Sequence, residues 1–276
     1  MKQHILFSLL CFAIVLNSQT SSAQIWKKVQ QKLEEKVEKK VDDVLDGKKK
    51  SMEDTTEDGQ ATGVEAVPNM EERYSFTPGG TIIFADDFKH DQEGKMASYW
   101  KSSGGGSVVN VSSVPGNWLA LAPNTTYRID SLLEISANFT IEFDLLTRSV
   151  EAKDIGAMQI GFARDNSNRS YIMDAYNDNA ITCMQLHFWN KEVTNSSSDT
   201  EIYNTLDFPL NNFSNGLLHV AITVEGQHMR IYVNKAKLLD TDMFKKDAVK
   251  YFYLSAPFDY KAGAKVFFSN FTWAKL

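Results

Sequence analysis

The chain has 276 residues, 43% of them hydrophobic and 23% charged, which is the composition of a globular protein with room for one sizeable core. The formal net charge at pH 7 is −6, and no basic patch lies in the region beyond residue 73, which argues against nucleic acid as a partner.

The first 23 residues have the pattern of a secretory signal peptide. Lys2 gives a positive start, the apolar stretch ILFSLLCFAIVL follows, and small residues favour cleavage between Ala23 and Gln24. The apolar stretch is shorter than the ~20 residues that a membrane-spanning helix needs. Lipid attachment at Cys11 fits poorly, because the bulky Leu10 precedes it. We therefore expect an exported protein whose mature chain keeps one cysteine, Cys183, and no internal disulfide.

Residues 24–48 predict a charged amphipathic helix. Its apolar residues recur at steps of three or four and form one narrow stripe: Trp26, Val29, Leu33, Val37, Val41 and Val44. Valine is a weak helix former, so one interpretation is a spacer helix of marginal stability. The alternatives are self-association through the stripe and contact with a membrane surface.

Residues 49–73 contain few aliphatic and many charged side chains. Such a segment cannot bury enough apolar surface to offset the entropy cost of ordering. We expect a disordered linker between the helix and the rest of the chain.

Residues 74–276 predict an all-β domain, because short alternating runs are separated by Gly, Asn, Asp and Ser with no helical stretch between them. The expected strands are TIIFADDF, SVVNVSS, NWLALAP, FTIEFDLL, GAMQIGFA, SYIMDAY, ITCMQLHFW, LLHVAITVEG, HMRIYVN, KYFYLSA and KVFFSNFTWAKL. A hairpin turns at EGQH, and a second turn at NKAK starts a further strand. The expected fold is a β-sandwich.

The hairpin segment LLHVAITVEGQHMRIYVNKAKLLD resembles part of laminin-G-like and concanavalin A-like domains. FADDF, NFTIEFDLL and VFFSNFTWAKL are similar to other parts of that superfamily, and they occur in the same order. The resemblance covers residues 82 to 276 and implies a jelly roll of two large antiparallel sheets.

A second resemblance concerns the cell envelope. The charged helix after the signal peptide, the acidic linker, YSFTPGGTIIFADDF and GKMASYW together resemble the amino-terminal half of Gram-negative OmpA-family envelope proteins. This resemblance implies a location in the periplasm, at the outer membrane or at the cell surface. The peptidoglycan-binding domain of that family does not follow Leu276, so peptidoglycan anchoring is not carried over.

Glu142 and Asp144 raise the question of catalysis. Laminarinase-type glycoside hydrolases of this superfamily carry a strand motif of Glu and Asp that a second Glu closes. Leu146 and Thr147 occupy the positions where that Glu would fall, so the general acid is missing. We interpret Glu142 and Asp144 as the non-core side of a strand, and keep them as a weaker candidate binding site.

The preferred candidate binding site follows from side-chain alternation in three of the predicted strands. Alternation places one set of polar and aromatic side chains on the face away from the core: Gln159, Asp174, Tyr176, Gln185, His187 and Trp189. Aromatic rings stack on the C–H faces of sugars, and amides and carboxylates pair with hydroxyl groups. Edge loops such as WNKEVTNSSSDTEIYN are the alternative place for a sugar.

Cofactor and metal signals are weak. The histidines have no metal-ligand spacing, and we expect no cofactor. Asp86 and Asp87 could hold a structural calcium ion, although aspartates that end a strand are commoner.

Three classes of function remain. The first is a non-catalytic envelope protein whose lectin-like sandwich binds glycan or a protein partner. The second is a structural envelope protein without a small ligand. The third is a laminarinase-like hydrolase, which would need a second acidic residue facing Glu142 from an adjacent strand.

Overall fold

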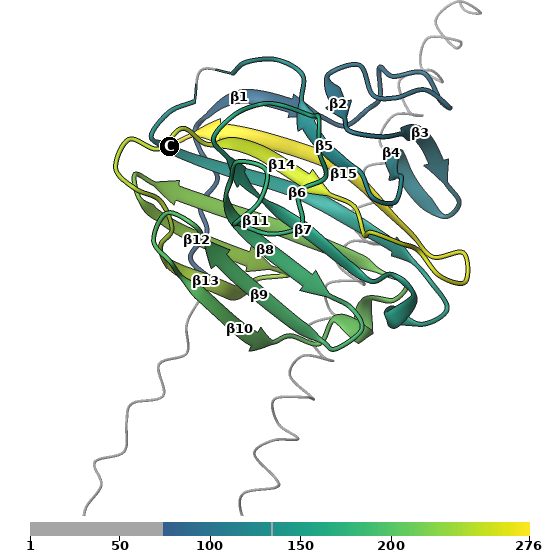
Figure 1. Ribbon diagram of the computed structural model, residues 1–276. Helices are drawn as coiled ribbons and strands as arrows, with labels where there is room; N and C mark the ends of the chain where they lie inside the picture. The colour runs from purple at the N-terminus through teal and green to yellow at the C-terminus, as the bar shows by residue number, and fades with distance from the viewer. Residues whose placement is uncertain (1–73, 134) are drawn as a thin grey trace, which may run out of the picture. The chain divides into compact units, whose positions relative to one another are not determined.

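The computed structural model describes residues 74–133 and 135–276, and the fold below is that of these residues (Figure 1). The predicted signal peptide (1–23), helix (24–48) and linker (49–73) lie outside the described residues. In the part of the chain that the structure covers, no helix has both the length and the apolar character needed to span a bilayer.

The described residues form an all-β fold with two short 3-10 helices. The strands are β1 (Thr81–Asp86), β2 (Trp100–Ser102), β3 (Gly106–Val111), β4 (Val114–Leu121), β5 (Thr126–Ile129), β6 (Asn138–Arg148), β7 (Ala157–Ala163), β8 (Ala180–His187), β9 (Glu192–Ser197), β10 (Tyr203–Asp207), β11 (Leu217–Glu225), β12 (His228–Val233), β13 (Ala236–Asp242), β14 (Tyr251–Ser255) and β15 (Lys265–Lys275). The 3-10 helices are η1 (Ala152–Asp154) and η2 (Leu210–Phe213).

The strands make two antiparallel sheets. The eight-stranded sheet has the order β13-β12-β11-β6-β15-β4-β3, and β1 pairs with the second half of β15. The seven-stranded sheet has the order β10-β9-β8-β7-β14-β5-β2. In Figure 1, β7, β8, β9 and β10 lie side by side in the layer nearer the viewer. We call the face of each sheet that is turned away from the other sheet its outer face.

The core lies between the sheets and follows from alternation along the central strands. In β6 and β11, alternate residues are fully buried and lie opposite one another in pairs: Phe139 with Val224, Ile141 with Ile222, Phe143 with Val220 and Leu145 with Leu218. Met184, Leu186 and Phe188 supply the same kind of surface from the seven-stranded sheet. Each such side chain contributes about 1.5–3 kcal/mol by leaving water.

The predicted hairpins are present. Glu225 pairs with His228 across the EGQH turn, where Gly226 has a φ of 62°. The turn into β13 has positive φ at both central residues, Asn234 and Lys235, which matches the twist of the flanking strands. The predicted all-β sandwich is therefore confirmed.

Two local predictions are wrong. SYIMDAY, expected as a strand, lies in the 164–179 connection between β7 and β8, which we call the β7–β8 loop. WNKEVTNSSSDTEIYN, expected as a long polar loop, contains β9 and the first two residues of β10, which form an antiparallel hairpin. Both segments shape the outer face of the seven-stranded sheet.

Candidate binding site

A polar row crosses the outer face of the seven-stranded sheet. It consists of direct cross-strand partners on five strands: Ser255, Gln159, Gln185, Thr194 and Thr205. The hydroxyl groups of Thr194 and Thr205 are hydrogen bonded at 3.0 Å, so both side chains lie on this face. The row is buried at Gln159 and Thr194, half-buried at Gln185 and exposed at Thr205. Its open members therefore lie on β8 and β10, on either side of β9.

The β7–β8 loop covers the other part of this face. The Tyr171 hydroxyl donates to Gln159 Oε1 at 2.9 Å, and Gln185 Nε2 donates to the Met173 carbonyl at 2.9 Å. The Ile172 amide donates to Thr126 Oγ1 at 2.8 Å. Cys183 lies beneath the loop, and burial raises the pKa of its thiol to about 12. The loop thus forms a wall beside the open part of the polar row.

His187 and Trp189 lie where β8 ends. Trp189 is 59% exposed, and its ring meets the imidazole of His187 edge-on at 6.1 Å between centroids. Burial lowers the pKa of His187, and the nearby Glu192 carboxylate opposes that shift only in part. The imidazole is therefore neutral at pH 7. Its Nδ1 atom is buried and has no hydrogen-bond partner within the described residues.

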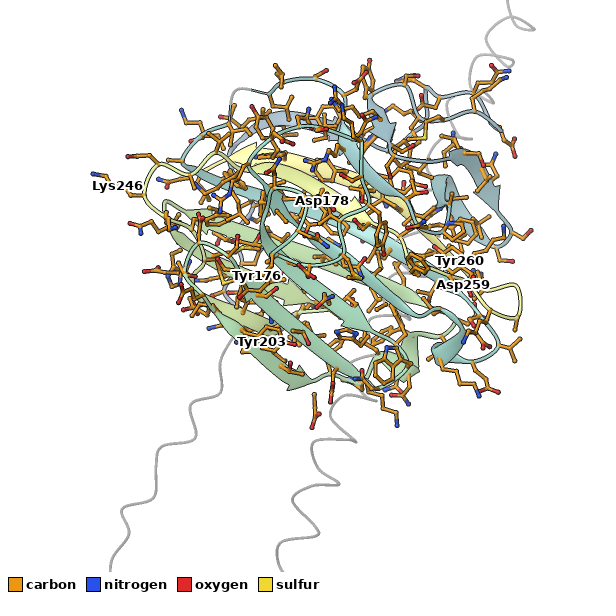
Figure 2. All side chains as sticks on the ribbon, in the orientation of Figure 1. Tyr176, Asp178, Tyr203, Lys246, Asp259 and Tyr260 are labelled. Atoms are coloured by element: carbon orange, nitrogen blue, oxygen red, sulfur yellow. The ribbon has the colours of Figure 1, made fainter. Side chains whose placement is uncertain are left out.

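Two tyrosines lie at the opposite end of the open area, as Figure 2 shows. Tyr176 is 58% exposed and its hydroxyl donates to the Ser197 carbonyl at 3.4 Å, which places the ring over β9. Tyr203 on β10 pairs with Ser196 and is 68% exposed. Asp174 accepts a hydrogen bond from the Tyr176 amide at 2.7 Å and so shapes the turn that presents this ring. We call Tyr176, Trp189 and Tyr203 the aromatic patch.

The structure thus places the six predicted residues as follows. Gln159 and Gln185 are direct partners on β7 and β8, and His187 follows on the same face. Asp174 and Tyr176 reach this face from the loop rather than from a strand. Gln159 is buried beneath Tyr171, whereas Tyr176 and Trp189 are exposed. Their role in binding stays a prediction.

Sequence reasoning missed the contribution of the β9–β10 hairpin to this face, namely Glu192, Thr194, Tyr203, Thr205 and Asp207. The alternation of YNTLD was the available signal, because it places Tyr203, Thr205 and Asp207 on one side of a strand. The surrounding Ser, Thr and Asn residues made the segment look like a loop.

Glu142 and Asp144, the weaker candidate site, lie on the outer face of the eight-stranded sheet and hold a histidine between them. His219 Nδ1 lies 2.8 Å from Asp144 Oδ1, and its Nε2 lies 3.4 Å from Glu142 Oε2. Asn270, at a bulge in β15, donates to Asp144 Oδ2 at 2.7 Å. Burial lowers the pKa of His219, but hydrogen bonds from its ring to Asp144 and Glu142 outweigh this effect and raise the pKa to about 9.

The residues directly opposite Glu142 on the adjacent strands are Ala221 on β11 and Thr272 on β15. Neither is acidic, so these positions do not supply the facing carboxyl group that the hydrolase hypothesis requires. Protonated His219 with two carboxylates is an internal ion-pair network that packs the sheet surface.

The candidate calcium ligands Asp86 and Asp87 end β1 and lie beside an open cavity of about 260 Å³. The Asp86 carboxylate accepts hydrogen bonds from the Phe88 amide at 3.0 Å and from Trp100 Nε1 at 2.9 Å. Asp87 Oδ2 lies 3.3 Å from Lys89 Nζ. Within residues 74–133 and 135–276, no three His, Cys, Asp or Glu side chains gather closely enough to hold a metal ion.

No protein-family model matches the chain, and no curated protein matches it either. Among solved structures it is similar to the carbohydrate-binding module CBM66 from Bacillus subtilis, at 13% identity and a TM-score of 0.43, over 64% of this chain and 96% of that one. It is also similar to the Ca2+-bound exoplasmic/lumenal domain of VIP36, at 9% identity and a TM-score of 0.47, over 69% and 88% of the two chains. The Emp47p carbohydrate recognition domain gives 9% identity and a TM-score of 0.48, over 69% and 94%. At this level the likeness is one of sandwich architecture and carries no argument about ligands.

Proposed function

We propose that this protein is a non-catalytic, exported glycan-binding protein whose site is the outer face of the seven-stranded sheet over β8, β9 and β10. The observation that carries the proposal is Trp189. Its ring is 59% exposed and stands beside a neutral imidazole at the end of a polar row.

This combination suits sugars. An exposed indole offers a flat apolar surface for the C–H face of a pyranose ring. Gln185 and Thr205 offer amide and hydroxyl groups, which both donate and accept hydrogen bonds as sugar hydroxyls do, and the buried Thr194 holds the Thr205 hydroxyl in place. Gln185 Nε2 is already bonded to the loop, so its carbonyl oxygen is the group that faces a ligand. Because β8 and β9 belong to a packed sandwich, these groups are held in place before a ligand arrives.

The non-catalytic part of the proposal rests on the outer face of the other sheet. Glu142 and Asp144 are both engaged by His219, and Ala221 and Thr272 occupy the places from which a second carboxyl group would act. A raised pKa at His219 indicates an ion pair rather than a general acid poised near pH 7.

The cellular location is proposed from the sequence. The basic start, apolar stretch and small residues of positions 1–23 support export, and the resemblance to OmpA-family proteins supports the envelope of a Gram-negative bacterium. The proposed ligand is a glycan. For residues 24–48, the alternatives are association with a second copy, contact with a membrane surface and a spacer role.

A glycan-array screen tests the proposal. The mature chain from Gln24 is compared with Trp189→Ala and with Tyr99→Ala, a matched control at a residue that is 55% exposed and immediately precedes β2. We expect binding to a defined glycan class that Trp189→Ala weakens at least about tenfold, in line with ~1.4 kcal/mol or more for a lost stacking contact. The control should bind as the parent chain does.

Absence of binding to every glycan, or binding that Trp189→Ala leaves unchanged, would contradict the proposal. The first result would favour a structural envelope protein, and the second would move the site to another face.

A further inference from the structure

The charges around the aromatic patch bear on which glycans this face can accept. We infer that the site binds an extended chain of uncharged sugars and rejects acidic glycans. This inference rests on the proposed function and adds the class of ligand to it.

Two carboxylates face each other beside Trp189. Glu192 on β9 is the direct partner of Asp207 on β10, and Glu192 is also the direct partner of His187 on β8. All three side chains lie on the outer face, because each is two residues along its own strand from a member of the polar row. Like charges directly opposite each other on a sheet repel.

Hydrogen-bond donors would relieve that repulsion. Glu192 Oε2 already accepts a hydrogen bond from Asn190 Nδ2 at 2.6 Å. Ionised carboxylates accept hydrogen bonds and cannot donate them, so the remaining oxygens of the pair suit the hydroxyl groups of a sugar. A metal ion would be the other means of relief, but within the described residues no group of three potential ligands comes together to bind one.

The loops around this face carry charges of both signs. Asp178 lies on the β7–β8 loop two residues after Tyr176, and Glu201 lies in the turn before β10. The Arg164 guanidinium is committed to Asp199 at 2.7 Å. Exposed cations also lie in the surrounding loops, namely Arg169 on the β7–β8 loop, Lys191 in the β8–β9 turn and Lys245, whose amide donates to Asp199. Lys246 projects at the far left edge of the view in Figure 2, away from Tyr176 and Tyr203. A glycan that carries carboxylate or sulfate groups would be repelled where it reaches the Glu192 and Asp207 pair beside Trp189.

The spacing of the rings sets the length of the ligand. His187 and Cys183 are four residues apart on the same face of β8. Cys183 pairs with Ser196 on β9, and Ser196 pairs with Tyr203 on β10. Four residues of strand span ~13 Å. One pyranose ring cannot stack on Trp189 and Tyr203 at once, whereas an oligosaccharide can contact both ends with Gln185 and Thr205 between them.

Calorimetric titration of the mature chain tests this inference with probes of matched length. The probes are neutral hexasaccharides of glucose, xylose and mannose, a galacturonate hexasaccharide, and the corresponding monosaccharides, all at low salt. We expect at least one neutral hexasaccharide to bind ten times more tightly than its monosaccharide and than the galacturonate chain. Trp189→Ala and Tyr203→Ala should each lower the affinity for that hexasaccharide.

Two double variants test whether the Glu192 and Asp207 charges set the preference for neutral glycans. The double substitution Glu192→Gln with Asp207→Asn should reduce the preference for neutral over acidic chains at least about fivefold. Glu225→Gln with Asp242→Asn removes the same two charges from the other sheet and should leave the preference unchanged.

The outcomes separate the two proposals. Tighter binding of the galacturonate chain, or equal affinity for monosaccharide and hexasaccharide, would overturn this inference and leave glycan binding in place. Absence of binding to every probe would remove the proposed function itself.

Discussion

At the scale of single residues, His219 explains why Glu142 and Asp144 lie together on a strand. Each of its ring nitrogens faces a carboxylate, so the ring is held in its doubly protonated, cationic form. Tyr74 lies close enough for Glu142 to contribute to raising the pKa of its hydroxyl, after burial, which is the main cause. The acidic pair is therefore part of the surface that the first described residues cover.

The ion pair predicts a dependence of stability on pH. The pKa of His219 is raised from 6.5 to about 9 in the folded chain, so its stabilisation is complete below pH 6.5 and is lost as the pH rises through about 9. Because the His219 side chain is 42% exposed, we expect an effect of only about 1 kcal/mol. Urea unfolding at pH 6 and at pH 9.5 should show this loss in the parent chain and not in His219→Gln.

His90→Gln is the control, because His90 is exposed in the connection between β1 and β2. The same pH dependence in the parent chain and in His219→Gln would contradict the ion pair.

At the scale of elements, the seven-stranded sheet depends on a close approach at Gly161 in β7. A Cβ atom at this position would lie 2.0 Å from the Thr182 carbonyl oxygen and 2.9 Å from the Tyr253 hydroxyl. Tyr253 donates to that same carbonyl at 2.9 Å, so neither neighbour can move without breaking a buried hydrogen bond.

Gly161→Ala should therefore destabilise the domain by about 3 kcal/mol or more, the range of severe overpacking. Gly80→Ala is the matched control, since no atom lies within 4 Å of the added carbon, and it should change stability by less than about 0.5 kcal/mol. Thermal unfolding followed by circular dichroism measures both. Equal melting temperatures for the two variants would refute the close approach.

The β7–β8 loop is the element that closes one half of the candidate site. Its residues bond to three different strands rather than to one strand partner, which is why it does not become part of the sheet. The thiol of Cys183 beneath it reports whether the loop is closed, because the exposed thiolate is the form that reacts with alkylating reagents.

Cys183 should resist iodoacetamide at pH 8 in the folded chain, because it is buried and its pKa is raised to about 12. Tyr171→Phe removes the hydrogen bonds to Gln159 and to the Ala256 carbonyl, and should accelerate labelling severalfold. Tyr99→Phe should not change the rate. Mass spectrometry of the peptide that contains Cys183 measures it, and rapid labelling of the parent chain would show that the loop is open.

At the scale of the whole molecule, the described chain enters the sandwich on the face opposite the candidate site. Ser75 Oγ lies 2.9 Å from the Tyr232 hydroxyl, and the Gly79 amide donates to Thr140 Oγ1 at 2.9 Å, both on the outer face of the eight-stranded sheet. The aromatic patch lies on the outer face of the other sheet. A domain attached through residue 74 can therefore turn its candidate site away from the point of attachment.

This arrangement predicts an autonomous domain. Residues 74–276 alone should fold with the β signature in circular dichroism, because the core pairs described above lie within this range. Deletion of residues 24–50 should change the sedimentation behaviour and leave that spectrum unchanged. Loss of the β signal in the 74–276 fragment would show that the sandwich needs the preceding residues.

The sequence by itself determined the fold class, most of the strands and the core face of each. Phe139, Ile141, Phe143 and Leu145 could be assigned to the core because side-chain direction alternates along a strand whatever its neighbours are. The hairpin at Gly226 was likewise readable, because a tight turn depends on the conformations of its own few residues.

Only the tertiary structure decided which side chains share the candidate site. SYIMDAY alternates as a strand does, yet Tyr171 and Ile172 find their partners at Gln159 and Thr126, which lie 12 and 46 residues away in the chain. The polar segment Glu192–Ser197 is a strand because β8 and β10 pair with it on both sides and because Asn195 and Ser197 bond to distant carbonyl groups. Whether a segment forms a strand or a loop depends on the free energy of burying it and pairing it with residues remote in sequence. A local sequence pattern does not contain that free energy.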